Sequence, residues 1–452
     1  MKRTRESIAS SMKRTRESIA SSTTRHRSKP AKELGSFADL SSLIITNILL
    51  QLPIKDVSIC KCVCKTWNAL ISEPYFATLY SQHASLGFLL RTRNLRLVSR
   101  TLHLLEYQPK KFRRAFDIDV VNFNPKFKLP LRNANDTYQP TPYKPEDDKF
   151  SVVNSCNGLL CLSEPYTVNH LVVCNPIIGE FIRLPEAIGI ANTRKPICAA
   201  LGFQPKTNEY KVIRMWKRCD GWCYKSDVMV VEMHTLGTAT WRNVEVDPMF
   251  SFTRLGSPTC VNGALHWINY DDKNKTRSIL CFNFESEKFQ SFPSPPHPHH
   301  KRLSITMVEL KGFLYICEST VNSCVVWLMK KYGIGESWTR VFCSDNFNGI
   351  PLCFGLCRPV KHFENGGGAL LIQNSYSCDS FIYYEPETRV FKVYSVDGAV
   401  SPWFELFPHS PGLISLKDVV KGGNIEVQNV YSRCAKVRVP EENESLSKIR
   451  RI

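Results

Sequence analysis

A weak repeat of about fifty residues runs through the second half of this 452-residue chain. Each unit contains a glycine followed by an apolar pair, and later an aromatic residue just after a polar turn. The aromatics are Phe181, Trp241, Phe289, Trp338 and Phe391, which are 60, 48, 49 and 53 residues apart. Short strand-like runs and turn signals at this period predict a propeller of four-stranded blades.

The glycine positions fit the same period. They are Gly158-Leu159-Leu160, Gly263-Ala264-Leu265, Gly312-Phe313-Leu314 and Gly368-Ala369-Leu370, with Gly202-Phe203 in the long gap. Glycine lets a chain turn tightly or approach a neighbour closely, and we expect each aromatic to pack between adjacent blades. Five units are visible, but a ring with this repeat length needs about six or seven blades. The missing strands are expected from residues 86–131 and 412–439.

The net charge of +18 is unevenly placed. Residues 1–33 and residues 91–114 each carry +7, so the positive field belongs to a tail and one patch. The eleven residues MKRTRESIASS occur twice in succession at the start, and such a charged, serine-rich segment cannot form a core. We interpret residues 1–36 as a disordered basic tail, either a nuclear localisation or nucleic-acid signal or a solvated segment without function.

Several classes of function find no support in the sequence. A run of eighteen apolar residues is missing, and the charged start has no apolar segment behind it, so we expect neither a membrane span nor a secretory signal. Eighteen cysteines without a signal indicate reduced thiols and a protein of the nucleus and cytoplasm. His297, His299 and His300 lie in a proline-rich segment that favours a flexible loop over a metal site. We predict no catalytic residue, metal or cofactor, because none of the common catalytic motifs occurs.

Residues 40–76 differ from the rest in having helical periodicity. Ser41 and Ser42 are N-cap candidates before an apolar run, and Pro53 should stop the first helix. Asp56 is a candidate cap for a second helix, in which Val57, Cys60, Cys64, Trp67 and Ile71 form one stripe that ends at Pro74. Two helices of about twelve to fifteen residues are marginal alone, so they pack either on this chain or on a partner.

This stretch resembles the F-box. The residues that carry the resemblance are Leu40, Ile48-Leu49, Leu52-Pro53, Val63-Cys64-Lys65-Thr66-Trp67, Leu70-Ile71 and Pro74-Tyr75-Phe76. Ser41 stands where the family usually has a proline at the adaptor contact. The resemblance implies binding to a Skp-type adaptor and, through it, to cullin and RING subunits of a ubiquitin ligase. The residues expected to contact the adaptor are Leu40, Leu43, Ile44, Ile48, Leu49, Leu52, Pro53, Val63, Cys64, Trp67, Leu70 and Ile71.

Residues 151–400 resemble the F-box-associated domain of plant F-box proteins. The carrying segments are 155–161 (SCNGLLC), 173–176 (VCNP), 184–185 (LP), 201–203 (LGF), 210–212 (YKV) and 261–267 (VNGALHW). The resemblance implies a kelch-like propeller that binds a protein to be ubiquitinated, without indicating which protein.

We therefore expect a mainly β, α+β chain, with a short helical F-box followed by a kelch-like propeller of about six to seven blades. The expected organisation is a tail (1–36), the F-box (37–80), a connector with the first propeller strands (81–150), the propeller (151–440) and a second tail (441–452). The predicted function is a non-enzymatic substrate receptor of an SCF-type ligase. The alternatives are a non-ligase scaffold or nucleic-acid binder that uses the basic patches, and a kelch-like oxidase or hydrolase.

Overall fold

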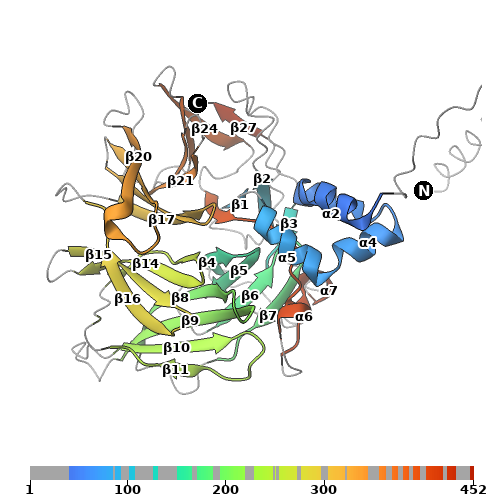
Figure 1. The fold of residues 1–452 in the computed structure, drawn as a ribbon, viewed down its shortest axis with the longest axis horizontal. Helices are drawn as coiled ribbons and strands as arrows, with labels where there is room; N and C mark the ends of the chain where they lie inside the picture. The colour runs from blue at the N-terminus through green and yellow to red at the C-terminus, as the bar shows by residue number, and fades with distance from the viewer. Residues whose placement is uncertain are drawn as a thin grey trace, which may run out of the picture. The chain divides into compact units, whose positions relative to one another are not determined.

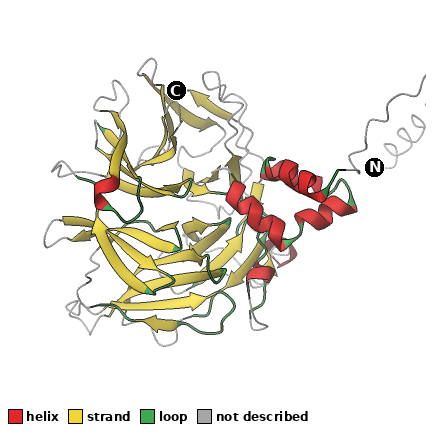
Figure 2. Cartoon of the chain, in the orientation of Figure 1, coloured by secondary structure: helices red, strands yellow, loops and turns green. Residues whose placement is uncertain are grey.

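The computed structural model describes part of the chain. The described residues are 40–84, 87–92, 101–106, 126–130, 150–164, 170–186, 194–218, 229–247, 250, 254–271, 276–296, 304–320, 323–344, 356–362, 369–374, 380–385, 390–397, 404–420, 425–433 and 448–451. The chain divides into two compact units, Met1–Ile45 and Thr46–Ile452. Figure 1 shows the elements in chain order, and Figure 2 separates the helices from the strands.

The first elements are four short helices. They are α2 (Ser42–Leu50), α3 (Ile54–Cys60), α4 (Lys65–Ile71) and α5 (Pro74–His83). The prediction of two helices of twelve to fifteen residues is therefore wrong. A turn at residues 61–64 divides the expected second helix, and a further helix follows it where Pro74 was expected to end the structure.

Local chemistry explains where these helices begin. Pro53 precedes α3 and Pro74 opens α5, positions at which the missing N–H costs nothing. Asp56, the expected cap, lies instead in the first turn of α3. Cys64 caps α4, because its Sγ accepts a hydrogen bond from the Trp67 N–H at 3.4 Å. The expected cap at Ser41 is present, since its Oγ accepts from the Ile44 N–H at 3.4 Å.

The strands form six sheets among the described residues. Five of them take successive strands from one continuous run of chain, as blades of the predicted kind, with four strands each in four sheets and five in the third. Their strands are β4 (Ser151–Cys156), β5 (Leu159–Ser163), β6 (Leu171–Asn175) and β7 (Glu180–Arg183); β8 (Arg194–Gln204), β9 (Glu209–Arg218), β10 (Met229–Thr235) and β11 (Arg242–Val244); β12 (Arg254–Leu255), β13 (Thr259–Val261), β14 (Ala264–Asp271), β15 (Thr276–Asn283) and β16 (Lys288–Pro293); β17 (Ser304–Leu310), β18 (Phe313–Ser319), β19 (Cys324–Met329) and β20 (Trp338–Ser344); and β21 (Leu356–His362), β22 (Ala369–Asn374), β23 (Ser380–Glu385) and β24 (Val390–Asp397). This is fewer than the six to seven blades predicted.

The sixth sheet is composite. It pairs β25 (Phe404–His409) with β1 (Gly87–Thr92), β2 (Thr101–Glu106) and β3 (Lys126–Lys128). It therefore joins the two ends of the β region, as expected for the strands from residues 86–131. The strands expected from residues 412–439 do not serve this purpose. Instead β26 (Gln428–Asn429) adds to β7, α7 (Val430–Arg433) follows it, and β27 (Lys448–Arg451) adds to β24.

A strap formed by residues 410–420 holds the end of β25 against the β4–β7 sheet. The Asn175 Nδ2 donates to the Gly412 and Ile414 carbonyls at 3.0 and 2.9 Å. The Glu180 Oε2 accepts from the Ser415 Oγ and the Leu416 N–H, both at 2.8 Å, at the start of α6 (Leu416–Val419). These bonds secure the junction between the composite sheet and its neighbour.

Apolar clusters fill the spaces between successive sheets, and four of the repeat aromatics belong to them as predicted. Trp241 packs on the cluster between the β4–β7 and β8–β11 sheets, and Phe289 lies in the next cluster. Trp338 and Phe391 occupy the following two. The repeat seen in the sequence is therefore a packing repeat.

The glycines of the repeat serve two purposes. Gly158, Gly263 and Gly312 have φ values of +83°, +72° and +80° in the turn between the first two strands of a blade, a conformation that glycine adopts readily. Gly202 lies within β8 and is packed by Phe284, since a Cβ there would overlap that ring.

Within the described residues, no helix combines the length and apolar character that crossing a bilayer requires.

Some predictions lie outside the described residues. They concern the basic tail, most of the basic patch at residues 91–114, the histidines at 297–300 and Gly368 of the repeat.

Candidate functional site

The helices between residues 42 and 83 leave several large apolar side chains exposed. On α2, Leu43 is 69% exposed, Ile44 46% and Ile48 43%. Beyond α2, Ile59, Val63 and Tyr75 are also exposed. Apolar groups gathered on short helices favour binding to a partner, because exposed patches of this kind are uncommon without a use.

The interior of this helical region is small. Ile54, Val57, Ile71, Phe76 and Tyr80 are buried. The Tyr80 hydroxyl donates to the Leu52 carbonyl at 3.0 Å and so ties α5 to the turn that follows α2. This bond satisfies a backbone acceptor where Pro53 prevents the helix from continuing.

The structure divides the predicted adaptor contacts into three groups. Exposed members are Leu43, Ile44, Ile48, Val63 and Cys64, and half-buried members are Leu40, Leu52, Pro53, Trp67 and Leu70. Leu49 and Ile71 are buried. These last two cannot offer a surface in this conformation, because their side chains are almost fully buried.

A cavity of about 1370 Å³ is lined by α5, by the first strands of the blades and by their turns. The turn residues in the wall are Asn157, Pro205, Asn208, Asn262-Gly263 and Lys311-Gly312. The wall includes His409, whose Nδ1 lies 2.9 Å from the Ser155 Oγ and whose Nε2 is buried without a hydrogen bond. Burial lowers the pKa of His409 to about 3, so the ring is neutral at physiological pH.

Glu309 lies in the same wall. Burial raises the pKa of its carboxyl, although the Gly312 N–H donates to its Oε1 at 2.6 Å and opposes that shift. Among the described residues, no group of three His, Cys, Asp or Glu side chains is arranged to hold a metal ion. The polar groups of the described wall therefore include the Ser155–His409 pair and the Glu309 carboxyl.

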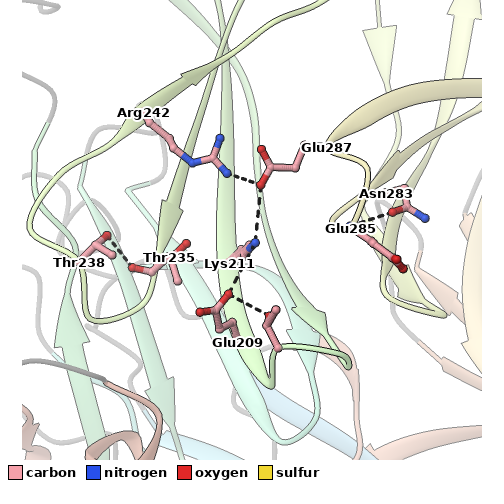
Figure 3. A network of polar contacts seen from close by, with 9 residues as sticks. Glu209, Lys211, Thr235, Thr238, Arg242, Asn283, Glu285 and Glu287 are labelled. Carbon is pink, nitrogen blue, oxygen red and sulfur yellow. Dashed lines mark hydrogen bonds and ion pairs between the residues drawn. The ribbon is translucent and has the colours of Figure 1, made fainter.

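A polar network links two adjacent blades at their surface (Figure 3). Glu287 accepts a hydrogen bond from Arg242 and lies 3.7 Å from the Lys211 Nζ, which is also 3.7 Å from Glu209. The hydrogen bond from Arg242 lowers the pKa of Glu287. Because its charges pair with one another around the buried Lys211, we interpret the network as a contact between blades.

Residues 109–416 match the family described as F-box associated beta propeller domain, and residues 37–78 match the F-box domain. The chain belongs to the F-box-associated β-propeller family. Its relatives include F-box protein At3g07870 of Arabidopsis thaliana, which is 25% identical over 83% of this chain and 92% of its own length. F-box protein At3g49450 of the same plant is 22% identical over 63% of this chain and 67% of its own length.

Solved structures align more loosely. The exo-beta-1,3-galactanase 1,3Gal43A from Clostridium thermocellum covers 56% of this chain and 70% of its own, at 11% identity and a TM-score of 0.30. A score this low does not bear on function.

The F-box region also exposes residues that the sequence reasoning missed. Ile59 is 55% exposed and Tyr75 70% exposed. A continuous second helix turns Ile59 away from the predicted stripe, so the periodicity does not indicate it. Tyr75 follows Pro74, which the prediction treats as a helix end. Proline is also common at the first position of a helix, and that signal could have revealed α5.

Proposed function

We propose that this chain is the substrate-recognition subunit of an SCF-type ubiquitin ligase. Its F-box would bind a Skp-type adaptor, and its propeller would hold the protein to be ubiquitinated. The observation that carries the proposal is the exposed apolar surface of the helices that match the F-box domain. An apolar helical face that fits a groove on a partner is a common mode of recognition.

In this role the chain contributes proximity. Holding a target next to the rest of the ligase raises the effective concentration of the reacting groups. We also propose that the composite β25–β1–β2–β3 sheet closes the ring of five blades, because it joins both ends of the β region and leaves fewer free edges. The kelch-like character and a location in nucleus and cytoplasm remain predictions.

Co-purification with a purified Skp-type adaptor tests the proposal. Ile48→Asp combined with Val63→Asp should abolish the pull-down, because a carboxylate cannot be buried in an apolar groove without a partner. Both positions are exposed, so the melting temperature should stay close to that of the wild type. Tyr431→Asp is a matched control, since Tyr431 is 50% exposed on α7. If the double variant still retained the adaptor, the proposed function would be wrong.

A further inference from the structure

The exposed apolar side chains of the propeller are concentrated at one place. Ten large apolar residues are exposed among the described residues, and six of them lie between Leu43 and Tyr75. Of the other four, Phe313, Tyr332 and Ile334 are 46%, 41% and 48% exposed and all belong to the β17–β20 sheet. Single exposed apolar residues are ordinary on a protein surface, whereas a group of them indicates an interaction site.

These three residues lie at the same end of that sheet. Phe313 follows the β17–β18 turn, and Tyr332 and Ile334 belong to the β19–β20 loop. Since the strands are antiparallel neighbours, both connections emerge from one end. Three lysines accompany them. We call this set the lysine–aromatic edge: Lys311, Phe313, Lys330, Lys331, Tyr332 and Ile334.

The β19–β20 loop is held by internal hydrogen bonds. The Ser337 Oγ donates to the Lys331 or Ile334 carbonyl, at 2.8 and 2.7 Å, and can accept from the Lys331 N–H at 3.1 Å. The Tyr332 hydroxyl lies 2.7 Å from the Nε2 of the buried His266. A loop fixed in this way loses little conformational entropy when a partner binds.

The charge of the edge indicates the chemistry of that partner. Lys330 and Lys331 are exposed beside the two apolar residues of the loop. Of the nearby acids, Glu309 already accepts the Gly312 N–H, which leaves Glu336 as the exposed carboxylate of the loop. Lys311 and Phe313 also line the 1370 Å³ cavity, so an extended segment on the edge could place a side chain in its mouth.

We propose that the lysine–aromatic edge binds an acidic segment of the target protein that carries a large apolar side chain. The acidic groups would pair with Lys330 and Lys331, and the apolar side chain would contact Phe313 or Ile334. That the partner is a protein to be ubiquitinated rests on the proposed function, whereas the pairing of acidic and apolar groups with this edge does not. Phe313 and Tyr332 could also stack on nucleic-acid bases, but Ile334 adds an aliphatic surface that suits an apolar side chain better than a base. Oligonucleotide binding that the edge variants abolish would therefore overturn the inference.

A phage-displayed random peptide library, selected on the immobilised full-length protein, tests this inference. The selected peptides should be enriched in Asp and Glu around a Phe, Leu or Trp. A synthetic selected peptide should bind about tenfold more weakly to Phe313→Ser/Ile334→Ser and to Lys330→Glu/Lys331→Glu, as when interface anchors are removed. Tyr431→Ser and Lys288→Glu change equally exposed positions elsewhere and should bind like the wild type.

Selection of peptides without acidic residues, or equal binding by the edge variants, would overturn the inference. So would self-association in analytical ultracentrifugation that the edge variants abolish, since the edge would then contact a second copy. Adaptor co-purification is measured on the same proteins. If the wild type did not bind the adaptor, only the proposed function would be contradicted. If the adaptor bound, but the selected peptides lacked acidic residues or bound the edge variants as well as the wild type, only this inference would be contradicted.

Discussion

The helices of the F-box and the sheets of the propeller treat apolar side chains differently. Of the ten large apolar residues exposed in the described residues, six lie between Leu43 and Tyr75, although this stretch is less than a tenth of the chain. The sheets instead bury Trp267, Phe282 and Phe284 completely and place the repeat aromatics between blades. The ring is stabilised by its own interior, whereas the helices leave apolar area exposed.

The two regions differ in exposed apolar area because the helical region is much smaller than the propeller. Short helices bury little surface among themselves, and most helical stability in proteins comes from packing against something else. A ring of sheets buries both faces of each blade against neighbours, so its core does not depend on a partner. Substitutions should therefore separate the two regions: those in the ring lower stability, and those on the helical surface lower adaptor binding.

Trp267→Ala should have the largest effect on folding. Trp267 is fully buried in the cluster between the β8–β11 and β12–β16 sheets. Removing a buried Trp side chain costs about 3–5 kcal/mol. Urea unfolding should show this loss, while the protein that remains folded should still bind the adaptor. Ile59→Ser is the counterpart on the helices and should change the free energy of unfolding by less than about 0.5 kcal/mol. Equal losses in the two variants would contradict the division.

Acid should destabilise the ring. Burial lowers the pKa of His409 to about 3, and mainly burial lowers those of His266 and His234 to about 4. Unfolded histidines titrate near pH 6.5, so the unfolded chain binds these protons first. Stability is therefore complete above about pH 6.5 and falls as the pH decreases toward 4, by up to about 1.4 kcal/mol per pH unit for each histidine.

Melting temperatures between pH 7.5 and 5 measure this effect. His409→Gln should make the pH dependence less steep. The unfolded chain then has one histidine fewer that binds a proton while the same residue stays neutral in the folded state. His83→Gln, at an exposed position in α5, should leave the profile unchanged. A profile that His409→Gln does not alter would show that His409 is accessible to water, contrary to its burial here.

Two glycines with nearly the same backbone conformation distinguish turn strain from packing. Gly158 and Gly312 have φ values of +83° and +80°. A Cβ on Gly158 would be 2.7 Å from Gly412 in the strap, whereas a Cβ on Gly312 would meet nothing within 4 Å. Gly312→Ala should cost about 1 kcal/mol from strain alone. Gly158→Ala should cost about 1–3 kcal/mol more, because the strap must move. Equal costs in chemical denaturation would mean that the strap is not held against this turn.

The cap of α4 gives the smallest predicted effect. Cys64→Ala removes the acceptor for the Trp67 N–H and should lower stability by about 0.5–1 kcal/mol. Cys64→Ser restores an N-cap acceptor and should recover it. If the serine variant also lost adaptor binding, Cys64 would act through direct contact, as the sequence predicted, in addition to capping.

Features carried by local patterns were predictable from the sequence. The aromatics from Trp241 to Phe391 recur because each fills one space between blades, and Gly158, Gly263 and Gly312 recur because each of their turns needs a positive φ. These constraints act within a unit, so the sequence displays them repeatedly. The pairing of β25 with β1 was harder to predict, because it spans more than three hundred residues and neither strand has a special composition.

The helical surface was predicted only in part for a related reason. Periodicity places Leu49 and Ile48 on the same apolar helix, but it does not say which of them faces the interior. The break at residues 61–64 carries no proline or glycine signal, so the second helix was predicted too long and Ile59 was missed. The lysine–aromatic edge depends on two segments that only the folded sheet brings to one end, and no linear pattern announced it.

Hydrogen–deuterium exchange of the full chain, with and without a Skp-type adaptor, tests the division between helices and ring most directly. We predict that adaptor binding slows exchange of amides in residues 43–75 and leaves those of the β4–β24 sheets unchanged. Slowed exchange in the sheets, or no change in residues 43–75 while the adaptor is bound, would contradict it.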